Sequence, residues 1–118
     1  MAYLLYPSII YLECKHSFNH TIVDWSKKYF KEHPELSNEL INALLDKKIS
    51  IIGVDFAGVR NGKEHVPMDQ YCADKGVFII ENLCNLKSLI YKNEFIVNTY
   101  PMNYADMTGL PCRIVAEI

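Results

Sequence analysis

Short runs of β-branched and aromatic residues recur along this chain, and each is bounded by polar, proline or glycine positions. Runs of this length and composition are typical of β-strands. The run at 50–55 is apolar between Ser50 and Asp55, and the run at 77–80 is apolar throughout. Such runs are typical of strands buried in a parallel sheet. We therefore expect strands over residues 8–13, 50–55, 77–80, 94–100 and 112–118.

Helical patterns fall between the first three of these runs. Ser37 is a suitable N-cap, and one apolar stripe at helical spacing follows it. The stripe consists of Leu40, Ile41, Leu44 and Leu45. A second helix is expected over Met68–Lys75, with Gly76 at the left-handed position that ends it. A weaker helical segment over 25–32 must stop before Pro34, because proline disfavours helical geometry in the residue that precedes it.

The expected order of elements is β-α-α-β-α-β-β-β, which predicts an α/β fold with a mixed β-sheet and flanking helices. Residues 1–118 contain no internal repeat, low-complexity tract or linker and are expected to form a single domain. Half of the residues are hydrophobic, and a chain of this length can bury one core without a metal or a disulfide. No element follows the last expected strand to cover its edge, so we expect association with a second copy or another chain.

Composition excludes several classes of function. The chain has 12 Lys and Arg residues and 14 Asp and Glu residues, and the two signs are mixed along the sequence. We therefore expect no basic surface for nucleic acid. No run reaches the ~20 apolar residues of a membrane-spanning helix, and we expect no membrane association. The four cysteines include no Cys-x-x-Cys pair, which favours free thiols in the cytoplasm. Glycine-rich phosphate-binding loops and the serine hydrolase elbow are also missing.

Two of the expected buried strands end in an acidic residue. Asp55 and Glu81 occupy these positions, where α/β proteins place their ligands. The segment between them adds the donors Glu64, His65 and Asp69. Carboxylates with an imidazole suit zinc, manganese or iron. The alternative is that these carboxylates only cap a helix or pair with Arg60 or Lys63, and the residues alone leave both interpretations open.

Five segments form an ordered series across residues 25–118. They are Trp25-Ser-Lys-Lys-Tyr-Phe, Leu36-Ser37, Ile51-Ile-Gly-Val-Asp55, Gly76-Val-Phe-Ile-Ile-Glu81-Asn-Leu83 and Gly109-Leu-Pro-Cys-Arg113. This series resembles the C-terminal half of the cyclase family, the metal-dependent hydrolases that include bacterial kynurenine formamidase. The N-terminal signature of that family, His-x-Gly-Thr-His-x-Asp-x-Pro-x-His, has no counterpart here. We therefore expect this chain to correspond to the back half of such a protein.

The resemblance implies a divalent metal, zinc or manganese, and hydrolysis of an amide, a cyclic amide or an ester. It places Glu81 at a metal-ligating glutamate and Asp69 at the position of a ligating histidine. His65, four residues before Asp69, is our own candidate for the missing imidazole. Further candidates for contacts to the ligands or to a small-molecule substrate are Asp55, Arg60, His65 and Arg113. No catalytic residue is assigned, because the family's catalytic histidine belongs to the missing signature.

Two functions stay open at this point. One is a metal-dependent amide hydrolase, and the other is a non-catalytic interaction module of related fold that joins a second copy or a partner chain. Both predict a homo-oligomer, a dimer or higher. The resemblance implies such assemblies, and the apolar, tyrosine-rich run over residues 1–12 offers a suitable surface.

Overall fold

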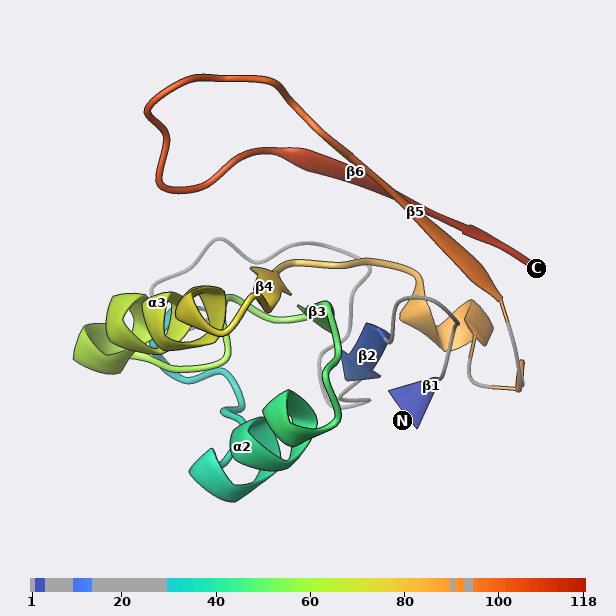
Figure 1. Cartoon of the computed structure of the whole chain (residues 1–118). Coiled ribbons are helices and arrows are strands. Elements are labelled where there is room, and N and C mark those ends of the chain that lie inside the picture. The colour runs from blue at the N-terminus through green and yellow to red at the C-terminus, as the bar shows by residue number, and fades with distance from the viewer. Residues whose placement is uncertain (1, 4–9, 14–29, 90, 93–94) are drawn as a thin grey trace.

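The structure, a computed structural model, describes residues 2–3, 10–13, 30–89, 91–92 and 95–118. Four strands form its main sheet, in the order β1-β2-β3-β4. β1 (Ala2–Tyr3) pairs antiparallel with β2 (Ile10–Glu13), whereas β3 (Ile51–Val54) and β4 (Phe78–Ile80) continue the sheet in parallel. The sheet is mixed, and helices flank it (Figure 1). The expected α/β fold is therefore confirmed.

Two helices connect the parallel strands. α2 (Asn38–Asp46) precedes β3, and α3 (His65–Asp74) lies between β3 and β4. The Ser37 hydroxyl caps α2 as expected, since it accepts a hydrogen bond from the Leu40 amide at 3.1 Å. Gly76 follows the end of α3 with a φ of 77°, which is the left-handed conformation that reverses the chain into β4.

The main hydrophobic core lies between the sheet and these two helices. Alternate residues of β3, Ile52 and Val54, point into it. The buried members of this core are Leu36, Ile41, Leu44, Ile49, Ile52, Val54, Phe56, Val59, Cys72 and Val77. Because α2 and α3 contribute to the same core, both helices cover one face of β3 and leave its other face to a different element.

That element is a separate hairpin of two antiparallel strands, β5 (Ile96–Pro101) and β6 (Cys112–Glu117). A second cluster anchors it, in which Ile51 points away from the main core. This cluster comprises Leu89, Phe95, Ile51, Leu83, Leu86, Val97 and Ala116. The Met102 amide donates to the Pro111 carbonyl at 3.0 Å and closes the loop of the hairpin. In Figure 1 the hairpin crosses above the main sheet, with its loop on the side of α3.

The second helix differs from the expectation at its beginning. It starts at His65, directly after a 3₁₀ turn over Gly62–Glu64, and not at Met68. Pro67 therefore lies in the first turn of α3, where a proline is tolerated because the amides of that turn have no helical partner. As a consequence His65 is part of a rigid helix and not of a loop.

The N-terminal predictions fall largely outside the described residues. Of the helix expected over 25–32, only residues 30–32 are described, and Phe30 and Lys31 are helical. Most of the tyrosine-rich run over 1–12 is likewise outside them. In the part of the chain that the structure describes, no helix combines the length and the apolarity needed to cross a bilayer.

Candidate metal site

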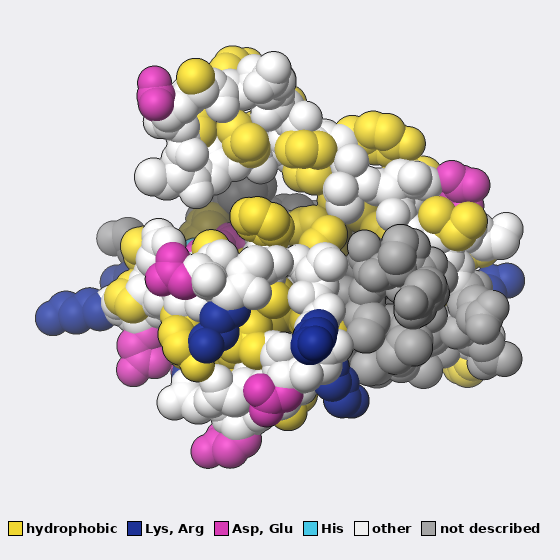
Figure 2. Space-filling view, viewed as in Figure 1, with side chains coloured by type: hydrophobic (Ala, Val, Ile, Leu, Met, Phe, Trp, Pro, Cys, Tyr) yellow, Lys and Arg dark blue, Asp and Glu magenta, His cyan; other side chains and the backbone are white. Residues whose placement is uncertain are grey.

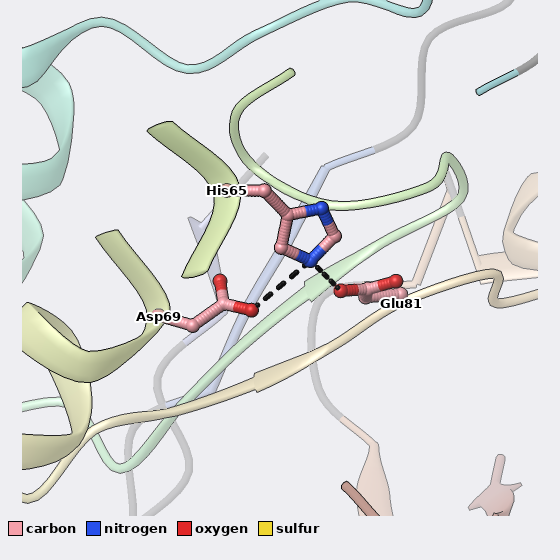
Figure 3. A group of neighbouring side chains, drawn as sticks. All are labelled: His65, Asp69 and Glu81. Carbon is pink, nitrogen blue, oxygen red and sulfur yellow. Dashed lines mark hydrogen bonds and ion pairs between the residues drawn. The ribbon is translucent and has the colours of Figure 1, made fainter. Parts of the chain in front are cut away.

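Three side chains with metal-binding atoms meet beside the end of β4. His65 Nε2 lies 2.8 Å from Glu81 Oε1 and 3.1 Å from Asp69 Oδ2. Figure 3 shows the imidazole between the two carboxylates, with its Nε2 directed at both. The ligand atoms of the three residues all lie within 4.8 Å of one another. The structure thus brings together the two metal-site residues expected from sequence and the candidate imidazole.

The positions of these residues follow from the helix and the strand that carry them. His65 and Asp69 are four residues apart on α3, so they lie one above the other on the same face. Glu81 comes directly after β4, whose chain returns alongside α3 after the turn at Gly76. The carboxyl end of β4 therefore reaches the N-terminal turn of α3, where His65 is.

Gly58 supports the imidazole from behind, and this residue was not expected from the sequence. A Cβ atom at Gly58 would lie 2.6 Å from His65 Cε1, and the φ of Gly58 is 106°. Glycine is needed here for both reasons: the ring lies too close for any side chain, and the backbone conformation is one that other residues rarely adopt. The only sequence signal was a glycine in the long loop after β3.

Electrostatics at the site centre on Asp69. Burial raises the pKa of the Asp69 carboxyl, the negative charge of Glu81 raises it further, and the charge and hydrogen bond of His65 oppose the shift. Its Oδ1 atom is buried and has no hydrogen-bond partner, whereas Oδ2 contacts His65. A buried carboxylate oxygen without a partner is costly, so this atom has unused capacity to bind a cation.

These three residues fit a divalent cation. Ligand atoms bound about 2.0–2.3 Å from a shared zinc ion lie roughly 3–4 Å from one another, and the distances from His65 Nε2 are close to that range. One imidazole nitrogen with two carboxylates is a donor set that zinc and manganese accept. The side chains are 31%, 33% and 28% exposed for His65, Asp69 and Glu81, so a cation could enter from solvent.

A cleft of about 880 Å³ opens from these residues. One wall is α3, and the second is β4. The third consists of the hairpin residues from Thr108 in the loop to Cys112 at the beginning of β6. The volume lies within the range that holds small-molecule ligands. The segment that the sequence analysis singled out as Gly109-Leu-Pro-Cys-Arg113 therefore contributes its first four residues to this cleft.

The remaining candidate residues lie elsewhere. Asp55 directly follows β3 as expected, but it is only 2% exposed and is neither in the three-residue cluster nor in the described lining of the cleft. The Arg60 side chain donates to Asn38 Oδ1 and lies 3.8 Å from both Glu35 and Glu64. It thus ties the loop after β3 to the beginning of α2. Arg113 is exposed on β6, outside the described lining of the cleft.

Comparison of the chain with protein-family models, with curated proteins and with solved structures finds no match. The arguments for function therefore come from the residues and their geometry.

Proposed function

We propose that this chain binds zinc or manganese through His65, Asp69 and Glu81 and acts as a metal-dependent hydrolase on an amide, a cyclic amide or an ester. The observation that carries the proposal is the convergence of one imidazole nitrogen and two carboxylates at the end of a cleft. The resemblance expected from the sequence implies metal ligands only at Asp69 and Glu81, and the geometry adds His65 to them.

A divalent ion bound there would polarise a carbonyl group and activate water. His65 would bind through Nε2 as a neutral imidazole, and this nitrogen would then face the ion between the carboxylates of Glu81 and Asp69. Asp69 would contribute a carboxylate whose Oδ1 has no other partner. The apolar walls formed by β4 and the hairpin loop would hold the organic part of the substrate and exclude water around it.

Metal binding is tested first, on protein stripped with a chelator and then titrated with zinc or manganese. We expect one ion per chain, bound at least about tenfold more weakly after His65→Ala, Asp69→Asn or Glu81→Gln. Glu64→Gln is the matched control, because Glu64 is next to His65 in sequence but its carboxylate contacts Arg60 and is mostly exposed. Unchanged binding in Glu81→Gln, or equal loss in Glu64→Gln, would contradict the assigned site.

Hydrolysis is tested separately, with an N-aryl formamide, a cyclic imide and an aryl ester as substrates. We expect turnover that requires the added metal and disappears in Glu81→Gln but not in Glu64→Gln. If the chain binds metal stoichiometrically but hydrolyses none of the three substrates, the proposed hydrolase activity is wrong and only the proposed metal binding is upheld.

We also propose that the chain associates with itself. The apolar surface of the hairpin and its loop supports this proposal. Exposed side chains there are Ile96, Tyr100, Met102, Tyr104, Met107, Leu110, Val115 and Ile118. Such a surface favours an interaction module that forms a dimer or higher homo-oligomer. Light scattering after size-exclusion chromatography should then give at least twice the chain mass of 13.6 kDa at micromolar concentration, and a monomer would contradict this proposal.

A further inference from the structure

The cleft beside the proposed metal site has an unusual distribution of charge. Among its described lining residues, the ionisable groups are His65, Asp69, Glu81 and the thiol of Cys112. Neither lysine nor arginine is part of this lining. The two arginines considered from the sequence do not serve it either, since Arg60 is engaged with acidic residues and Arg113 lies outside it.

The rest of the lining is apolar or neutral. The lining includes Val77 and all three residues of β4, of which Phe78 is largely exposed. Leu110 and Pro111 of the hairpin loop form the opposite wall. Figure 2 shows hydrophobic side chains on both sides of the hollow between hairpin and body. The neutral hydrogen-bonding side chains of the lining are Gln70, Asn82 and Thr108.

These surroundings discriminate between neutral and anionic molecules. A carboxylate in the cleft would lose hydration against apolar walls and gain no cationic side chain from the described lining in return. In the metal-free chain it would also lie near the carboxylates of Asp69 and Glu81, and like charges brought together oppose binding. A neutral amide or ester with a ring or a branched chain has neither cost, and it buries apolar surface against β4 and Leu110.

We propose that the cleft takes an uncharged amide or ester with an apolar substituent and rejects counterparts that carry a carboxylate. The inference deepens the proposed function and rests on it for the reaction at the metal end. Its charge discrimination is a property of the cleft walls, and it can therefore be measured on the metal-free chain.

The probes are N-acetylphenylalanine amide and N-acetylphenylalanine, which share the ring and the acyl group and differ in the carboxylate. Binding to the metal-free, ¹⁵N-labelled chain is followed at pH 8 through the backbone amide signals of Val77, Ile79 and Leu110. We expect the amide probe to shift these signals and to bind at least about tenfold more tightly than the acid. Equal or tighter binding of the acid, or binding of neither probe, would overturn the inference.

A pair of arginine variants tests the cause. Leu110→Arg adds a cation to the cleft wall at an exposed position and should increase affinity for the acid at least about fivefold without improving that of the amide. Met107→Arg adds the same charge to the same loop outside the described lining and should change neither. Equal gains in both variants would show a general surface effect and overturn the inference.

The metal titration described above is independent of these measurements. If zinc and manganese fail to bind while the cleft still binds the amide probe more tightly than the acid, the proposed hydrolase is wrong. The inference that the cleft prefers uncharged molecules is then upheld. If metal binds as proposed and the amide does not bind more tightly than the acid, only the inference about the cleft is wrong.

Discussion

Replacing Gly58 by alanine should damage the proposed metal site without changing any of its three proposed ligands. The added Cβ would lie 2.6 Å from His65 Cε1 and 3.0 Å from Nδ1, whereas carbon atoms in contact prefer about 3.5–4.0 Å. The imidazole must therefore retreat by about 1 Å. Its Nε2 atom now lies 2.8 Å from Glu81 and 3.1 Å from Asp69, so such a shift breaks at least one of these contacts.

The backbone adds a second cost, because Gly58 has a φ of 106°. A non-glycine residue held in a sparsely populated conformation costs about 1–3 kcal/mol. We therefore expect Gly58→Ala to lower the free energy of unfolding by about 1–3 kcal/mol. Zinc affinity should fall roughly 10–100-fold, the loss found when a residue that orients a metal ligand is changed.

Gly62→Ala separates these two effects. Gly62 also has a positive φ, 54°, but no atom lies within 4 Å of its added Cβ. This control should lose about 1–2 kcal/mol of stability and keep its zinc affinity. Urea unfolding in the presence of a chelator gives the stability, and competition with a chromogenic chelator gives the affinity. Wild-type zinc binding in Gly58→Ala, or an equal loss of binding in Gly62→Ala, would refute the reasoning.

Three further predictions concern the fold around the site. Ser37→Ala removes the side-chain acceptor of the Leu40 amide and should cost about 1 kcal/mol in urea unfolding; no loss would show that the cap is dispensable. Burial raises the pKa of the Cys72 thiol, with Asp69 adding to the shift, so Cys72 stays protonated to a higher pH than an ordinary thiol. Iodoacetamide followed by peptide mass spectrometry at pH 8–9 should therefore label exposed Cys84 well before Cys72, and equal rates in the folded protein would contradict this. Phe95→Leu in the cluster that anchors the hairpin should cost less than about 1.5 kcal/mol and speed amide exchange in β5 and β6 more than in α2; uniform acceleration would argue against a local anchor.

Local patterns in the sequence were sufficient for much of the fold. The apolar stripe after Ser37 predicted α2, and the runs at 50–55 and 77–80 predicted the strands that the structure has over 51–54 and 78–80. These elements depend on spacing, capping and side-chain branching, which act over a few residues. For the same reason, the placement of Asp55 and Glu81 directly after strands could be stated in advance. The expectation that both strands are buried was wrong for β4, in which Phe78 is exposed and Ile79 and Ile80 are only partly buried.

The beginning of α3 could not be predicted in the same way. The helix was expected to begin at Met68, whereas it begins at His65, three residues earlier. Pro67 does not prevent this earlier start, because a proline in the first turn removes an amide that has no helical partner. The error matters because it had left His65 in a loop, and its position on the helix places it above Asp69.

Contacts between distant segments decided the rest. Glu81 meets His65 because the chain reverses at Gly76, Gly58 lies against the imidazole from a loop seven residues earlier, and Thr108 to Cys112 reach the cleft from the hairpin. The sequence by itself determined the elements and the acidic residues at strand ends. Only tertiary packing determined which donors converge, that Asp55, Arg60 and Arg113 lie apart from them, and that the cleft has no basic side chain among its described residues. Such convergence depends on how whole strands and helices are oriented relative to one another, and a short stretch of sequence does not determine that orientation.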